Sequence, residues 1–290
     1  MFAEHDRSAF EIHVFSLSSS KNVYADAIAA GKPIVIVMGD SNAEGWGLPE
    51  EATIPRQLEK SFNNDVTFVN SAIRFAGPIL HAIRLREILP TYHPAAVLWL
   101  LTEKDYGYDR FADALAVERD KERFPILFSR ADTSPVADWI RRLERYLPGK
   151  IYLLEYLAQS ATVRQTRAIL DRAPISAFDP CLGVSRLLQA AEAARVPVLP
   201  VLMPIGPNYL FETDLARFPE TWNCVVKTSH IAPIDARRPE FQGEELMLPH
   251  DSHFNARGAE KFAHFLALHL GQLPVLQGRD LPSEIKGKIR

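Results

Sequence analysis

Three side chains from opposite ends of the chain have the types and spacing of a nucleophile, a general base and the group that orients the base. Residues 34–41 read IVIVMGDS, an apolar run that ends in a Gly-Asp-Ser turn with Ser41 as its last residue. A serine hydroxyl is a poor nucleophile unless a neighbouring base takes its proton. Asp251 and His253 flank one serine, so their side chains leave an extended segment on the same side. We therefore predict that Ser41 attacks a carbonyl carbon, that His253 takes and returns the proton, and that Asp251 orients the imidazole.

These residues also have other interpretations. Asp and Ser are frequent turn residues, so the turn by itself does not identify a nucleophile. The His and Asp residues of both ends could be metal ligands, namely Asp40, His250, Asp251 and His253. Metal-dependent phosphoesterases usually spread several such motifs along the chain, whereas this sequence has no second His/Asp cluster. No G-x-G-x-x-G motif follows the first apolar run either. We therefore predict neither a metal nor an organic cofactor.

Apolar runs alternate with amphipathic stretches between the two ends. Five runs rich in Val, Ile and Leu predict strands: Ile34 to Met38, Val66 to Asn70, Ala96 to Thr102, Lys150 to Tyr156 and Val196 to Met203. Helices are predicted at Ile54 to Phe62, Ile79 to Leu89, a segment that opens at Ser134, Leu182 to Ala194, and Ala256 to Leu270 with Asn255 as its cap. Runs that are apolar throughout are typical of strands covered on both faces. We predict an α/β fold, a single doubly wound three-layer αβα sandwich with a mainly parallel five-stranded sheet.

The chain is predicted to contain one folded domain with flanking segments. The α/β domain spans residues 31–272, after an N-terminal extension at 1–30 and before a C-terminal tail at 273–290. Two segments, 106–133 and 208–249, are long, polar and dotted with aromatic residues and prolines. We predict that they are excursions over the carboxyl edge of the sheet, where ligands bind in such folds.

The composition is that of a globular protein and argues against several classes. Hydrophobic residues make up 47% of the chain and the net charge is -3, so no overall basic field attracts nucleic acid. No apolar run is long enough to predict a membrane span. Cys181 and Cys224 show no metal-ligand spacing and are interpreted as two buried thiols. As written the chain reads as cytoplasmic, and it would be periplasmic or secreted if a leader has been removed, so the compartment is left unknown.

The two end blocks together resemble the SGNH/GDSL hydrolase superfamily. Residues 39–41 match its first block, and Asp251 and His253 match its last block. The last block reads D-x-H-x-N-x-x-G, one residue tighter than the usual D-x-x-H, and resembles the alginate acetyltransferase-like branch of polysaccharide O-acetylation proteins. The resemblance implies a flavodoxin-like fold and a carboxylic ester hydrolase or O-acyltransferase. It favours a small-molecule or glycan ester as substrate, and most of all an O-acetylated carbohydrate.

The middle blocks of that family, which complete its oxyanion hole, match less closely. Where the family has Asn-x-Gly-x-x-Gly, residues 70–78 read NSAIRFAGP, and where it has Gly-x-Asn-Asp, Lys104 replaces the asparagine. Candidate oxyanion and substrate-binding residues are Arg74, Phe75, Ala76, Gly77 and Lys104. Arg74 could hold an anionic group or be a surface charge.

Two other functions remain open. Middle blocks that differ from the family pattern are compatible with a catalytically weakened, carbohydrate-binding module. The same fold also occurs in lipid ester and thioester hydrolases. Four aromatic residues could line a sugar or acyl pocket, or pack long loops onto the domain: Trp46, Tyr209, Phe211 and Trp222.

Overall fold

The structure is a computed structural model of the 290-residue chain. It describes residues 27–74, 76–110, 178–205, 216–248 and 251–277. The predicted strand at Lys150 to Tyr156 and the predicted helix that opens at Ser134 lie outside these ranges.

The chain divides into two compact units. One comprises Met1–Phe15 with Arg110–Asp179, and the other comprises Ser16–Asp109 with Pro180–Arg290. All helices and strands described below belong to the second unit. The predicted domain boundaries at 31 and 272 stay a prediction.

The second unit is built on a five-stranded sheet in the order β2-β1-β3-β4-β5, with parallel pairing throughout. Its strands are β1 (Ile34–Met38), β2 (Thr67–Asn70), β3 (Ala96–Leu101), β4 (Val198–Leu202) and β5 (Ile234–Asp235). This strand order is the flavodoxin-like one, and the predicted fold class is confirmed. Every residue of β1, β3 and β4 is buried, as their uninterrupted apolar sequences require.

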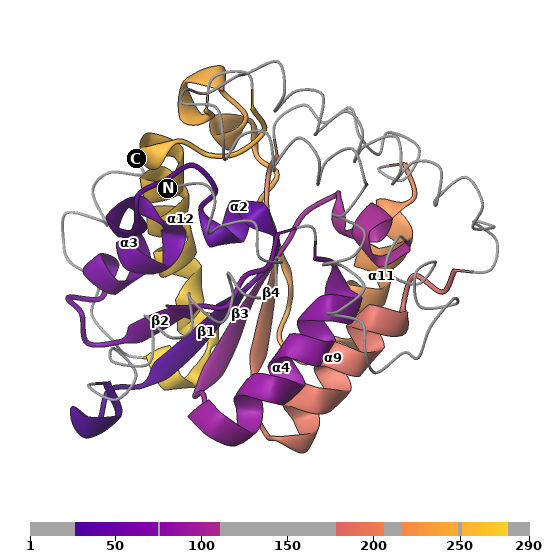
Figure 1. Ribbon diagram of the computed structural model, residues 1–290, viewed down its shortest axis with the longest axis horizontal. Helices are drawn as coiled ribbons and strands as arrows, with labels where there is room; N and C mark the ends of the chain where they lie inside the picture. The colour runs from indigo at the N-terminus through magenta and orange to yellow at the C-terminus, as the bar shows by residue number, and fades with distance from the viewer. Residues whose placement is uncertain (1–26, 75, 111–177, 206–215, 249–250, 278–290) are drawn as a thin grey trace, which may run out of the picture. The chain divides into compact units, whose positions relative to one another are not determined.

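Helices cover both faces of this sheet (Figure 1). The helices α3 (Ile54–Ser61) and α12 (Ala256–His269) pack together on one face. The other face carries α4 (Pro78–Tyr92) and α9 (Leu182–Ala193), with α11 (Phe218–Thr228) against α9. The short α2 (Ser41–Glu44) begins at the carboxyl end of β1. Short 3-10 helices lie at Glu50–Ala52, Pro239–Phe241, Glu244–Leu246, Leu270–Gln272 and Pro274–Leu276.

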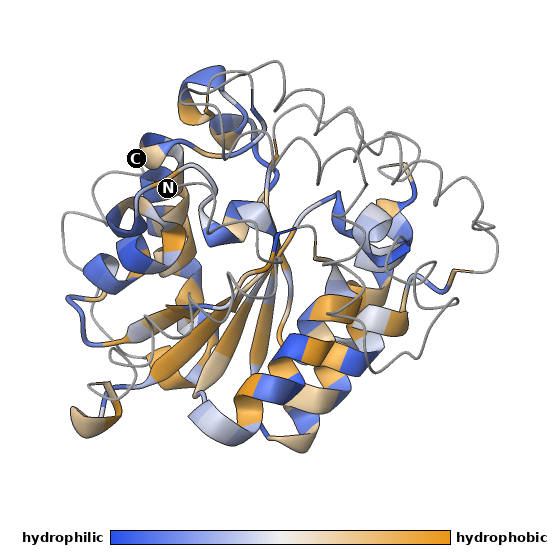
Figure 2. Ribbon diagram, viewed as in Figure 1, coloured by the Kyte–Doolittle hydropathy of each residue, from blue (hydrophilic) through white to orange (hydrophobic). Residues whose placement is uncertain are grey.

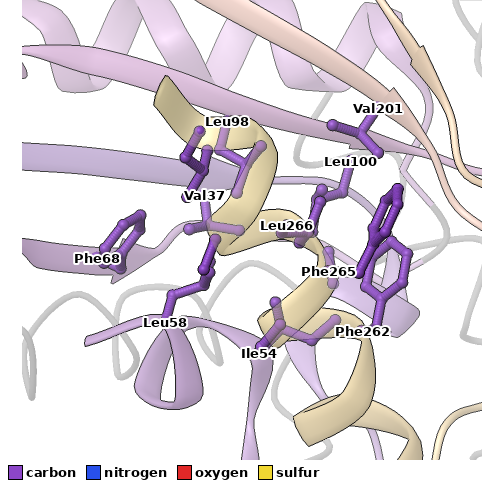
Figure 3. Packing of buried hydrophobic residues seen from close by; sticks show 14 of the residues in the cluster. Val37, Ile54, Leu58, Phe68, Leu98, Leu100, Val201, Phe262, Phe265 and Leu266 are labelled. Carbon is purple, nitrogen blue, oxygen red and sulfur yellow. The ribbon is translucent and has the colours of Figure 1, made fainter. Parts of the chain in front are cut away.

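The main hydrophobic core lies between the sheet and the α3/α12 layer. The strands are apolar along their length, whereas the helices turn polar residues outward (Figure 2). In Figure 3, Val37 and Leu100 from the sheet face Leu58 of α3 and Phe262 and Leu266 of α12. Each fully buried side chain of this size contributes about 1.5 to 3 kcal/mol relative to an exposed one. This packing fixes α12, and therefore the residues that immediately precede it, against the sheet whose strand β1 leads into Ser41.

The segment 208–249, which was predicted to be an excursion, contains an α-helix and a β-strand that were not predicted. It contains α11, and it contributes β5 as the edge strand of the sheet. β5 consists of only two residues, which is too short to be recognised as an apolar run in the sequence. The sequence of α11 mixes polar and apolar residues, so the helix was not predicted. Its buried face includes Phe218 and Val225.

The interpretation of the two cysteines as buried thiols is wrong. Cys181, immediately before α9, and Cys224 of α11 form a disulfide with a Cα–Cα distance of 5.5 Å. The two residues are 43 positions apart, and only the packing of α11 against α9 brings them together. The spacing of the two cysteines along the chain therefore did not predict the disulfide.

Candidate active site

The Gly-Asp-Ser turn lies at the carboxyl end of β1, which pairs with β2 and β3. Ser41 is the first residue of α2, and Asp40 caps the helix because its Oδ1 accepts the N–H of Asn42 at 2.8 Å. A Cβ on Gly39 would lie only 2.5 Å from both Ala43 Cβ and the backbone oxygen of Leu100. Glycine is therefore required where the turn passes β3, and the turn presents the Ser41 side chain at the edge of the sheet.

The second half of the site is a short loop immediately before α12, the acid–base loop (residues 251–253). An antiparallel bridge between Met247 and Phe254 closes its base, and the Leu248 N–H donates to the His253 carbonyl at 2.8 Å. Asn255 caps α12 as predicted, since its side chain accepts the Gly258 N–H at 3.0 Å. The loop is thus attached to a helix whose inner face is buried in the core.

The structure brings the three predicted catalytic residues together in one hydrogen-bonded chain. Ser41 Oγ lies 2.7 Å from His253 Nε2, and His253 Nδ1 lies 2.5 Å from Asp251 Oδ1. Because a carboxylate is an acceptor only, the Nδ1 proton points to Asp251 and leaves Nε2 to accept the Ser41 proton. Ser41 is 7% exposed. The arrangement can generate a serine nucleophile with an oriented general base.

The hydrogen bond to His253 keeps Asp251 ionised. Burial by itself would raise the pKa of Asp251, but the hydrogen bond from His253, the positive charge of a protonated imidazole there, and the N–H groups of Ser252 and His253 hold it below its ordinary value. The backbone N–H of His253 also donates to Asp251 Oδ1 at 3.2 Å. The carboxylate is therefore available to stabilise an imidazolium formed during catalysis.

A buried network that the sequence did not predict ties the nucleophile turn to the segment after β3. Thr102 Oγ1 lies 3.0 Å from Asp40 Oδ2 and 3.0 Å from Asp105 Oδ1. Burial, followed by the charge of Asp40, raises the pKa of Asp105 well above its ordinary value. The Thr102 hydroxyl bridges the carboxyl groups of Asp40 and Asp105. Thr102 closes a predicted strand, and a polar residue at the end of an apolar run was the only sequence signal for this contact.

Two of the predicted oxyanion residues make hydrogen bonds of their own in the structure. Lys104 is buried, and its ammonium donates to Ser252 Oγ at 2.7 Å. Ala76 donates its N–H to the Ile73 carbonyl at 3.2 Å. Gly77 caps α4, and Phe75 lies outside the described residues. Their role in an oxyanion hole stays a prediction.

Arg74 and Trp46 form a stacked pair beside the imidazole of His253. The Arg74 guanidinium lies 3.8 Å from the centre of the Trp46 ring and donates to Glu44 Oε2 at 2.7 Å. The Trp46 ring centre is 6.5 Å from that of His253, and Trp46 is 39% exposed. Its backbone N–H donates to the Ser41 carbonyl at 3.0 Å. Trp46 therefore has exposed ring surface close to His253, while Tyr209 and Phe211 lie outside the described residues.

Within the described ranges, no group of three or more His, Cys, Asp and Glu side chains is arranged to hold a metal ion. His250 lies outside them. No helix in the described part of the chain has the length and apolarity to cross a membrane.

No protein-family model matches the chain, and no curated protein matches it. Among solved structures, a G-D-S-L family protein from Desulfitobacterium hafniense is 11% identical with a TM-score of 0.46, covering 82% of this chain and 99% of that one. A GDSL-like lipase from Bacteroides thetaiotaomicron is 12% identical with a TM-score of 0.43, covering 87% and 97%. The psychrotrophic esterase EstA from a Pseudoalteromonas species is 14% identical with a TM-score of 0.41, covering 82% and 97%.

These neighbours bear the names of GDSL proteins, lipases and esterases. Identities and TM-scores of this size assign no family to the chain. The geometry of the site is therefore the basis for assigning a function.

Proposed function

We propose that this protein is a serine-dependent hydrolase of carboxylic esters that acts through an acyl-enzyme. The observation that carries the proposal is the hydrogen-bonded chain from Ser41 through His253 to Asp251, with links of 2.7 and 2.5 Å. Such a chain supplies the base and the orienting group that a serine needs.

The reaction follows from the roles of these three side chains. Ser41 Oγ attacks the ester carbonyl carbon while His253 Nε2 takes its proton, and Asp251 stabilises the resulting imidazolium. The imidazolium then gives the proton to the departing alcohol oxygen, and the acyl group remains on Ser41. Water, activated by the same imidazole, releases the acid. An alcohol in place of water would make the protein an acyltransferase.

The developing oxyanion needs donors beside Ser41 Oγ. Ser41 is the first residue of α2, so its own N–H has no acceptor within the helix and is the first proposed donor. The loop from Phe75 to Gly77 and the loop that contains Lys104 are the proposed sources of further donors. The N–H of Ala76 would have to exchange or share its present acceptor to serve in this way, whereas the Lys104 ammonium has three donors and its bond to Ser252 uses one of them.

For the substrate we propose an O-acetylated carbohydrate. Trp46 supports this choice because it is 39% exposed at 6.5 Å from the His253 ring, and Arg74 stacks on it. A flat aromatic surface beside the nucleophile suits the face of a sugar ring. In the variant Trp46→Ala we expect the KM for an acetylated monosaccharide to rise about tenfold. The KM for ethyl acetate, which has no ring, should not change.

The positions of the candidate oxyanion donors also favour a second function, a carbohydrate-binding module with little or no catalysis. The single N–H of Ala76 already donates to the Ile73 carbonyl, and loss of one oxyanion donor typically costs about 10² to 10³ in rate. A module of this kind would bind acetylated glycans without releasing acetate.

One assay separates the two proposals. Turnover of p-nitrophenyl acetate is compared between the wild type, Ser41→Ala and Ser61→Ala. Ser61 is a buried serine of α3 that bonds the Gln57 carbonyl, so it serves as the matched control. The esterase proposal predicts a loss of about 10⁴-fold or more for Ser41→Ala alone. Equal rates in the wild type and Ser41→Ala would refute it and favour the binding module.

A further inference from the structure

A buried lysine reaches across the site to the acid–base loop. Lys104 is 4% exposed and lies three residues beyond the end of β3. Its Nζ donates to Ser252 Oγ at 2.7 Å, and Ser252 is itself 8% exposed. Ser252 is the residue between Asp251 and His253. The contact therefore anchors the loop at Ser252, between Asp251 and His253.

The surroundings of Lys104 make this contact stronger than an ordinary surface hydrogen bond. Burial lowers the pKa of Lys104, while the nearby carboxylates of Asp40 and Asp251 and the carboxyl of Asp105 act in the opposite direction. A hydrogen bond with a charged donor is roughly twice as strong as one between neutral groups. A buried ammonium that lost its acceptor would remain desolvated and unpaired, which is costly.

The same short segment also holds the nucleophile turn. Thr102 lies 3.0 Å from Asp40 Oδ2, and Asp40 caps the helix that begins with Ser41. Residues 102–105 thus contact both halves of the site, the turn through Thr102 and the acid–base loop through Lys104. The two halves are far apart in the sequence, since Ser41 and His253 are separated by 212 positions.

We propose, resting on the serine hydrolase function above, that residues 102–105 are a clamp that sets the Ser41–His253 geometry, with Lys104 as the positioning residue that anchors Ser252. The clamp differs from an oxyanion role because Lys104 acts through the loop and does not touch the substrate. A displacement of about 1 Å between catalytic groups can lower the rate about 100-fold. Loss of either partner of the anchor should therefore lower kcat.

The test uses Lys104→Met, Ser252→Ala and the double variant in the full chain. Lys60→Met is the matched control, because Lys60 is exposed and bonds a backbone carbonyl, that of Glu51. For p-nitrophenyl acetate we expect each single variant to lower kcat about 10- to 100-fold with little change in KM. The double variant should lose no more than the worse single variant, because both changes remove one contact.

Amide hydrogen exchange of residues 251–253, followed by mass spectrometry, provides a readout that does not depend on activity. Faster exchange in both Lys104→Met and Ser252→Ala, but not in Lys60→Met, is the expected result. Unchanged exchange in both variants would overturn the clamp. A loss of kcat in Lys104→Met with normal kcat and exchange in Ser252→Ala would also overturn it, and would assign Lys104 to the oxyanion.

Failure of the proposed function is distinguishable from failure of the clamp. If Ser41→Ala and the wild type turn over the ester equally, the hydrolase assignment is wrong, and with it the catalytic part of the clamp. The exchange experiment still decides whether Lys104 anchors the loop. Ser252→Ala removes a single hydroxyl group. If Lys104→Met does not fold, Ser252→Ala still tests whether the contact anchors the loop.

Discussion

Substitution of the buried histidine on α4 should change how the stability of the protein depends on pH. His81 has no exposed surface, and its Nδ1 accepts the indole N–H of Trp99 at 3.1 Å. An indole nitrogen can only donate, so the imidazole is neutral with its proton on Nε2. Protonation would place a second donor against the indole. Burial lowers the pKa of His81 to about 4, despite the opposing effect of the Asp40 charge.

The magnitude follows from linkage between proton binding and folding. In the unfolded chain His81 has its ordinary pKa of 6.5. Below that pH the unfolded state therefore binds a proton at His81 that the folded state does not bind. The stability that neutral His81 contributes is fully present above pH 6.5 and is lost as the pH falls towards 4. Between pH 7.5 and pH 4.5 the loss is about 2 to 3 kcal/mol.

The assay is urea denaturation of the wild type and His81→Gln at these two pH values. Glutamine keeps an acceptor for the Trp99 indole but does not titrate. The difference in unfolding free energy between the two proteins should therefore shift by about 2 to 3 kcal/mol in favour of the variant at pH 4.5. His230→Gln is the control, because the His230 side chain is 78% exposed. A difference that is the same at both pH values would refute the reasoning.

Two further predictions concern the orienting carboxylate and the disulfide. Asp251→Asn should lower kcat for p-nitrophenyl acetate by about 10⁴-fold without loss of fold, because an amide no longer selects the tautomer of His253, and a loss below about tenfold would contradict its role. Replacing Cys181 and Cys224 by serine should lower the unfolding free energy in urea by about 4 kcal/mol, because the disulfide joins residues 43 positions apart. Equal stability of the wild type with and without a reductant would contradict that estimate.

The parts of the fold that were predictable are those with strong local patterns. β1 and β3 were predicted because strands covered on both faces must be apolar at every position. α12 was predicted with its cap because Asn255 precedes an amphipathic stretch. β5 was missed because a two-residue edge strand has no pattern of its own and depends on its pairing with β4.

The same distinction applies to the site. Ser41 and the Asp251–His253 pair were predictable because nucleophilic catalysis requires these residue types, and each end block shows its spacing locally. The contact between Lys104 and Ser252 was not predictable, because it joins positions 148 apart that show no complementary pattern. Packing of α12 against the sheet creates that contact. The sequence could therefore name the candidate reacting groups but not the contact between Lys104 and Ser252.

The most direct test of the account is covalent labelling of the wild-type protein with a fluorophosphonate, followed by intact mass and mapping of the adduct. The account predicts one adduct on Ser41, formed much more slowly in His253→Gln, because phosphonylation requires a serine activated by its base. An adduct on another residue, or no adduct under conditions that label a known serine esterase, would contradict the claim that Ser41 is a nucleophile.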